Sequence, residues 1–263
     1  MSDDIAEATK PRRTRLLRVA EHVRTQNWTA IGIDFLIVVL GVFVGIQVSN
    51  WNAERAERQR GAEFTQRLRA DLEGERWVYQ FMVAYYSDVR DAANVAVAAL
   101  EGDADVSNHD LLVAAYRATQ YREGARRRDT YDELVSTGSL GLIPDQALLD
   151  RAAAIYRVRT IENVVRESME QSFRRQFRQS IPNAVQRALG RNCGDRLILP
   201  GQYEGMDTVI DYPCTLELAA DDIDAAAQVL RSDPALLRAL RLRIADLDTR
   251  LGDFTVNNRD LFE

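Results

Sequence analysis

An apolar run near the N-terminus constrains the fold of this chain more than any other feature. The run lies between Trp28 and Trp51 and holds a single charged side chain, Asp34. At 1.5 Å per residue, about 20 helical residues cross the ~30 Å hydrocarbon core of a bilayer. Tryptophan is enriched at both membrane interfaces, so Trp28 and Trp51 fit the role of interface anchors. The sequence therefore predicts a transmembrane helix over residues 28–50.

Two other interpretations of this run stay open. It could be the core helix of a soluble protein, although so long an apolar run is unusual there. It could also be a cleaved signal peptide, but the run is long for a signal peptide and no A-x-A cleavage site follows it. We favour an uncleaved signal-anchor that lies in the lipid bilayer. Basic residues are similarly frequent on both sides, so they do not decide the orientation.

The segment after the anchor has the pattern of a long amphipathic helix. Residues 51–102 contain no proline, and Phe64, Leu68 and Leu72 recur at four-residue spacing. Apolar residues at this period form one face of a helix, with charged residues on the other face. We expect one or two long membrane-proximal helices, which end at Gly102.

Residues 103–263 are expected to form a helical domain, an antiparallel bundle in a mostly α protein. Ser107 is a candidate N-cap for the first helix. Residues 130–145 contain Gly138, Gly141 and Pro144, which predict a short helix followed by a turn. Residues 190–215 have no helical period, and we expect loops or one short hairpin there.

The other helices of the domain have recognisable start signals. Asp145 can cap one long helix that continues to about residue 180, and Pro182 either kinks or restarts it. A further helix is expected around residues 219–230. The last helix is predicted to begin at Asp233 and Pro234, with proline in the first helical position.

The two cysteines, Cys193 and Cys214, lie in the irregular segment. They are the only cysteines in the chain. In an oxidising compartment they could form a disulfide, whereas in the cytosol they would be free thiols. Two thiols without nearby histidines make a poor zinc site, and we predict neither a metal nor another cofactor.

Three residues of the predicted membrane segment are candidates for function. A carboxylate at membrane depth, such as Asp34, is a functional hypothesis by default. It could be linked to proton flow or pair with a partner, or it could be hydrated near the interface or pair with Arg24. Gly41 and Gly45 form a G-x-x-x-G motif, which allows close helix approach. Helix association there is one prediction and chance occurrence is the alternative.

The rest of the chain offers no catalytic motif. It lacks G-x-S-x-G, Walker, G-x-G-x-x-G, H-E-x-x-H and C-x-x-C patterns. His109, Asp132 and Glu133 are weak candidates for a hydrolase or transferase site, and we assign no catalytic residue. The run at residues 126–128, three arginines, could bind phosphate or lipid headgroups, but internal pairing on the surface is the preferred interpretation.

Two segments resemble a family of single-pass bacterial membrane proteins of unknown function, designated domain of unknown function 6090. The resemblance rests on the glycine and acidic residues of the apolar run, on its polar exit, and on an aromatic-acidic-leucine segment: Gly32, Ile33-Asp34, Gly41, Gly45, Ser49-Asn50-Trp51-Asn52 and TYDELVSTGSLGLI from Thr130. It covers about 60 residues. It implies an N-terminus inside and a long domain outside, and it supplies no activity. The cysteine-containing segment 190–214 has no equivalent in the family pattern.

These features predict a protein of the bacterial inner membrane. We expect a cytoplasmic basic tail at residues 1–27 and a periplasmic helical domain. The domain is interpreted as a non-catalytic scaffold, sensor or interaction module, with a second copy or another envelope protein as its partner. The alternative is a subunit of a proton-motive-force-linked complex that uses Asp34. The net charge of −6 argues against nucleic acid as a partner.

Overall fold

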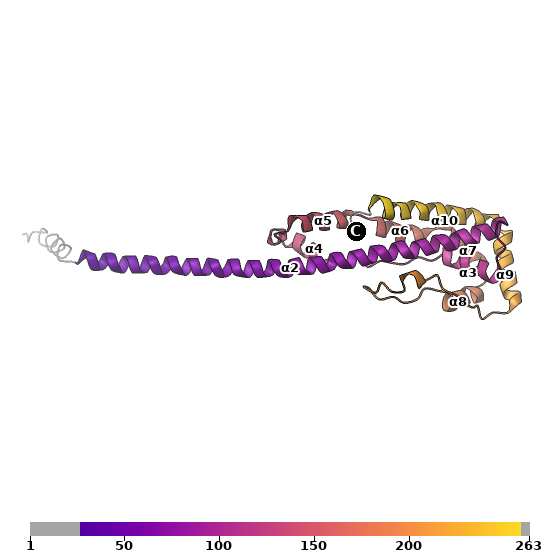
Figure 1. Ribbon diagram of the computed structural model, residues 1–263, viewed down its shortest axis with the longest axis horizontal. Coiled ribbons are helices and arrows are strands. Elements are labelled where there is room, and N and C mark those ends of the chain that lie inside the picture. Colours follow the sequence, from indigo (N-terminus) through magenta and orange to yellow (C-terminus); the bar gives the residue numbers. More distant parts are fainter. Residues whose placement is uncertain (1–26, 259–263) are drawn as a thin grey trace, which may run out of the picture. The chain divides into compact units, whose positions relative to one another are not determined.

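The computed structural model describes residues 27–258, and all regular secondary structure in them is helical (Figure 1). The mostly α fold is therefore confirmed. The helices, including short 3-10 (η1, η2) and π (η3) turns, are α2 (Trp28–Glu101), α3 (Asn108–Ala118), α4 (Asp129–Ser136), η1 (Leu140–Leu142), α5 (Gln146–Arg157), α6 (Thr160–Glu170), α7 (Ser172–Ser180), α8 (Asn183–Asn192), η2 (Met206–Thr208), α9 (Ala220–Ser232), α10 (Pro234–Gly252) and η3 (Asp253–Asn257).

The chain divides into two compact units between Gln59 and Arg60, inside α2. In the first unit the structure describes the helix from Trp28 onward, and every described residue of it is exposed. The predicted basic tail lies almost entirely outside the described residues.

The second unit is built around two hydrophobic clusters that share α2 and α10. The first cluster takes α2 from Leu68 to Val89 and the end of α10, together with α4, α5 and α6. The second takes α2 from Ala93 to Ala99 and the start of α10, together with α3, α7, α8 and α9. Glu101 at the end of α2 pairs with Arg241 in the first half of α10. These two helices therefore run antiparallel, as Figure 1 shows.

Helix α2 continues through Gly61 and Gly74, so the expected membrane-proximal section is one helix. Both glycines lie where another part of the fold comes close. A Cβ at Gly61 would lie 2.3 Å from the carbonyl oxygen of Leu142, and one at Gly74 would lie 2.9 Å from the Arg127 side chain. The helix ends before Gly102, whose φ of +85° favours glycine.

Several predicted helix starts are confirmed by their capping bonds. Ser107 accepts a hydrogen bond from the Asp110 amide at 3.1 Å. Asp145 accepts one from the Leu148 amide at 3.1 Å, and Asp233 accepts one from the Ala235 amide at 2.8 Å. Each bond satisfies an amide that the helix itself leaves without an acceptor.

The prediction of one long helix from Asp145 to about residue 180 is wrong. Helices α5, α6 and α7 occupy this range, with breaks at Val158–Arg159 and at Gln171. At the first break, the Arg126 guanidinium donates to the carbonyl oxygens of Ile155 and Val158, at 3.2 and 3.1 Å. A distant side chain thus satisfies the carbonyls at the end of α5. Pro182 starts α8 rather than kinking a helix.

The irregular segment begins later and ends later than predicted. Helix α8 continues to Asn192, and the Cys193 amide still bonds the Leu189 carbonyl at 2.8 Å. The segment then runs to Ala219 with only η2 as regular structure. No strand forms within the described residues, so the hairpin alternative is wrong. A single backbone bond, from the Arg196 amide to the Val209 oxygen at 2.8 Å, connects its two sides.

Candidate functional site

The first candidate site is the apolar surface of the N-terminal unit. Within α2, an 18-residue window has a mean hydropathy of 2.5, and none of it is buried in the protein. Phe35 is 71% exposed and Val38 is 63% exposed, which is far above the exposure of a core residue. A soluble protein rarely leaves so large an apolar patch in water. The segment is therefore compatible with a single-pass membrane protein.

The functional candidates of this segment all lie on its exposed surface. Asp34 is exposed, and its proposed partner Arg24 lies outside the described residues. Nothing in the described chain lies within 4 Å of a Cβ built on Gly41 or Gly45, so that face is open to another helix. At the far end, the Arg55 guanidinium lies 5.9 Å from the centroid of the Trp51 ring.

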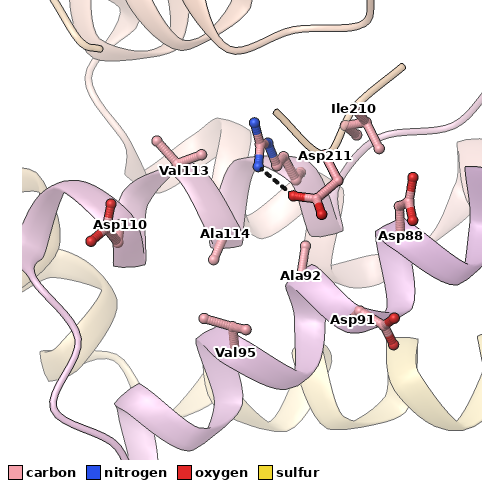
Figure 2. Close-up of a pocket in the computed structure, with 10 residues that line it drawn as sticks. Asp88, Asp91, Ala92, Val95, Asp110, Val113, Ala114, Ile210 and Asp211 are labelled. Atoms are coloured by element: carbon pink, nitrogen blue, oxygen red, sulfur yellow. Dashed lines mark hydrogen bonds and ion pairs between the residues drawn. The ribbon is translucent and has the colours of Figure 1, made fainter. Parts of the chain in front are cut away.

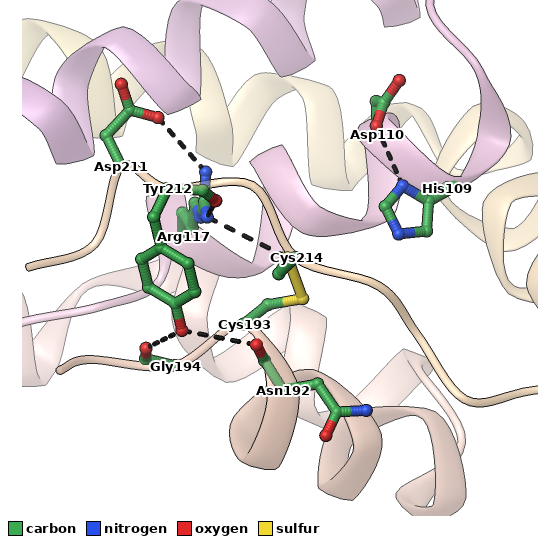
Figure 3. Close-up of a disulfide and its surroundings, with 9 residues drawn as sticks. All are labelled: His109, Asp110, Arg117, Asn192, Cys193, Gly194, Asp211, Tyr212 and Cys214. Atoms are coloured by element: carbon green, nitrogen blue, oxygen red, sulfur yellow. Dashed lines mark hydrogen bonds and ion pairs between the residues drawn. A yellow bond between two sulfur atoms is a disulfide. The ribbon is translucent and has the colours of Figure 1, made fainter. Parts of the chain in front are cut away.

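The second candidate site is the loop that the two cysteines close. Cys193 and Cys214 form a disulfide, with Cα atoms 5.4 Å apart and a sequence separation of 21 (Figure 3). This pairing agrees with the predicted disulfide and not with two free thiols. Cys193 follows α8 directly and is fully buried. The bond therefore joins the end of α8 to the far side of the irregular segment.

Arg117 of α3 attaches this loop to the helices. Its guanidinium donates to the Tyr212 carbonyl oxygen at 2.5 Å and lies 3.3 Å from the Asp211 carboxylate. The Tyr212 hydroxyl donates in turn to the Gly194 carbonyl oxygen at 2.5 Å (Figure 3). Near the middle of the loop, the Trp77 indole donates to the Gln202 carbonyl oxygen at 2.8 Å. The loop has little secondary structure, but a side chain of α2 holds it near its middle and a side chain of α3 holds it near Cys214.

Where the loop meets α2 and α3 there is an acidic cavity of about 260 Å³ (Figure 2). Its carboxylates are Asp88 and Asp91 from α2, Asp110 from α3 and Asp211 from the loop, and its one basic group is Arg117. Burial, followed by the charges of Asp211 and Asp91, raises the pKa of the Asp88 carboxyl to about 7. One buried oxygen of Asp88 has no hydrogen-bond partner among the described residues.

The cavity is chemically suited to proton binding near neutral pH. A carboxyl with a pKa of about 7 changes its charge in the range where ordinary aspartates are fully ionised. Among residues 27–258, no three acidic, histidine or cysteine side chains converge to hold a metal ion. The sequence does not distinguish Asp88 from other aspartates, because the carboxylates that raise its pKa come from the loop at residues 207–211 as well as from its own helix.

The three weak catalytic candidates do not form one site. The His109 ring bonds the Asp110 carboxylate at 2.9 Å on α3. Asp132 and Glu133 lie on α4, where Asp132 pairs with Arg128 and Glu133 pairs with Arg67. Each of these carboxylates is thus engaged in an exposed ion pair.

The arginine run at residues 126–128 is paired largely inside the protein. Arg126 lies 2.6 Å from the fully buried carboxylate of Glu75 and 2.8 Å from Glu162. The same Glu75 carboxylate accepts the backbone amide of Arg127. Arg128 pairs with Asp132. These ion pairs agree with the prediction of internal pairing and not with a surface that binds phosphate or lipid headgroups.

Comparison with known proteins adds no relative. No family model, no curated protein and no solved structure matches the chain.

Proposed function

We propose that this chain is a single-pass protein of the bacterial inner membrane, with its N-terminal tail in the cytoplasm and its helical domain in the periplasm. There the domain acts as a non-catalytic scaffold, sensor or interaction module. The proposal includes membership of the family of unknown function that the apolar run and residues 130–143 resemble. Residues 129–136 and 140–142 form the short helix and turn that Gly138, Gly141 and Pro144 predict.

The observation that carries the proposal is the combination of an exposed apolar helix and a disulfide in one chain. The helix is long enough to cross a bilayer. Disulfides persist in oxidising compartments such as the periplasm and are rare in the cytosol of mesophiles. A chain with both an apolar helix and a disulfide is what we expect of a protein with an anchor inside the membrane and a domain outside the cytoplasm.

A topology experiment tests the proposal directly. A reporter that is active only outside the cytoplasm is fused after Glu263 in the full chain, and the matched control carries the same reporter after Asn27. We expect activity from the first fusion and none from the second. Thiol labelling of the unfused protein is expected to modify Cys193 and Cys214 only after reduction.

The opposite result would be equally informative. An inactive reporter after Glu263, together with two thiols that react without reductant, would place the domain in the cytoplasm. That outcome would overturn the proposed orientation and the periplasmic role.

The proposed self-association has its own test. Because successive helical residues are about 100° apart, Gly32 lies on the opposite side of the helix from Gly41. Leucine at Gly41 and Gly45 is expected to reduce cross-linked dimer in membranes, because it prevents close helix approach. Leucine at Gly32 is the matched control and is expected to leave the dimer unchanged. Equal dimer yields from both variants would contradict association through this face.

The alternative function makes Asp34 the working residue of a proton-linked membrane complex. Its support is the exposure of this one carboxyl on the apolar surface of α2. Asp34→Asn keeps the size of the side chain but cannot release a proton. Loss of function in cells that express this variant at wild-type levels would favour the alternative, and wild-type behaviour would exclude it.

A further inference from the structure

A second cavity, of about 340 Å³, lies among α3, α7 and α8. These helices contribute to the same hydrophobic cluster. Its wall carries three arginines, Arg174 and Arg178 from α7 and Arg187 from α8, and Tyr116 from α3. None of the described residues that line it is acidic. We call this cavity the arginine pocket.

Within residues 27–258, no carboxylate pairs with the arginines of the arginine pocket. Arg174 donates to the Thr119 carbonyl oxygen at 2.9 Å and lies 4.7 Å from the centroid of the Tyr121 ring. Burial lowers the pKa of Arg174, and the positive charge of Arg178 lowers it further. No ion pair found within residues 27–258 includes Arg174, Arg178 or Arg187. The chain as a whole has a net charge of −6, so this local excess opposes its overall charge.

Helix geometry directs polar groups toward the pocket. Arg174 and Arg178 are four residues apart on α7, and residues three or four apart share a helix face. Asn183, Arg187 and Gly190 follow the same rule on α8 and line the pocket. Helix α8 starts at Asn183, which lines the pocket, and no side chain caps its first amides.

Gly190 lines the pocket where α8 comes close to α3. A Cβ at this position would lie 3.5 Å from the Tyr116 hydroxyl. That hydroxyl is therefore close to the backbone of α8. The pocket combines three guanidinium groups and a phenol around an open volume.

We propose that the arginine pocket binds a phosphoryl group, as free phosphate or pyrophosphate or as the headgroup of a phosphate monoester. Guanidinium presents parallel N–H donors that match the oxygens of phosphate. Three positive charges without a carboxylate suit a dianion better than a singly charged carboxylate. The volume accommodates the phosphoryl group together with part of the molecule that carries it. The inference concerns the folded domain and does not depend on the membrane orientation proposed above.

Calorimetric titration of the full chain in a nonionic detergent tests this site. The probes are inorganic phosphate, pyrophosphate and a short-chain phosphatidic acid, with phosphatidylcholine as the neutral lipid control. The variants are Arg178→Gln and Arg187→Gln, both at exposed positions. The matched control is Arg191→Gln, an exposed arginine of α8 outside the pocket lining. A thermal melt of each variant checks that the fold is retained.

We expect the wild type and Arg191→Gln to bind the phosphoryl probes equally. Each pocket variant is expected to bind about tenfold more weakly, because it loses a charged hydrogen bond. Binding of the free anions assigns a soluble ligand, and binding of phosphatidic acid alone assigns a lipid headgroup. Absence of heat with all three probes would overturn the proposal, as would equal weakening by Arg191→Gln.

Discussion

Removing the Cys193–Cys214 disulfide is expected to lower the free energy of unfolding by about 3 kcal/mol. The bond spans a sequence separation of 21. A cross-link of this span removes loop-closure entropy from the unfolded chain, and the chain-entropy relation gives about 3 kcal/mol at 25 °C. The compact unit that holds the bond runs from Arg60 to Glu263. For a domain of about 200 residues, 1 kcal/mol shifts Tm by about 2–4 °C, so the loss corresponds to about 6–12 °C.

Removal of the disulfide is expected to act mainly on the unfolded chain, because other native contacts hold the loop in the folded state. In the folded state, the loop remains attached through Arg117 and the Tyr212 carbonyl oxygen, and through the Trp77 indole and the Gln202 carbonyl oxygen. These contacts do not require the sulfur–sulfur bond. Loss of the bond should therefore leave the loop in place while it enlarges the set of unfolded conformations.

The assay is thermal unfolding of the full chain in detergent, followed by far-UV circular dichroism. Wild type is measured with and without reductant, beside a variant with serine in place of both cysteines. Reduced wild type and the variant are expected to have the same Tm, and this Tm is expected to be lower than that of the oxidised wild type. The variant itself should not respond to reductant. An oxidised wild type that unfolds at the temperature of its reduced form would refute the reasoning.

Three further predictions concern the helical domain. Because burial raises the pKa of Asp88 from 3.8 to about 7, the folded protein binds this proton more tightly than the unfolded chain does. Tm of the wild type should therefore fall as the pH rises from about 4 to about 7. Asp88→Asn should flatten this profile, and an unchanged slope would contradict the assignment. Gly61→Ala should lower Tm because its Cβ meets a backbone oxygen at 2.3 Å, whereas Gly74→Ala meets a flexible side chain and should be milder. Similar melts for the two alanine variants would contradict this distinction. Glu75→Gln should lower the free energy of unfolding, measured by chemical denaturation, by about 3 kcal/mol or more, because it leaves Arg126 without its buried partner. A decrease smaller than that caused by breaking an exposed ion pair would contradict this prediction.

Local signals in the sequence were sufficient for the helical framework. The start signals at Ser107, Asp145 and Asp233 depend on side chains within three residues of the amides that they cap. The apolar residues at helical spacing on α10, which include Leu236, Leu240 and Leu247, are buried. Such short-range chemistry can be predicted from one sequence.

Long-range contacts account for what the sequence did not reveal. The helix break after Arg157 depends on Arg126, which comes from the connection between α3 and α4. The buried Arg243 is a second example, because it donates to Ser168 at 2.9 Å and to the Gln120 carbonyl oxygen at 3.2 Å. Neither residue is distinguishable by local pattern in a chain with 34 basic residues.

The candidate sites divide in the same way. The apolar run and the cysteine pair are visible in the sequence because composition alone distinguishes them. The acidic cavity around Asp88 and the arginine pocket form only when α2 and the loop, or α7 and α8, are brought together. Their residues are ordinary surface types until the packing of the helices is known.

The closed loop also makes the protein tolerant of insertion. Its ends are covalently joined, while Gly201 near its middle is an exposed turn residue with a φ of +88°. Each doubling of a loop adds only about 0.6 kcal/mol of closure entropy. An epitope placed between Pro200 and Gly201 should therefore leave the helical domain folded. A protease that cuts there would leave two fragments that stay linked until they are reduced. An affinity epitope at this position would allow the intact protein to be purified without disturbing either helical cluster.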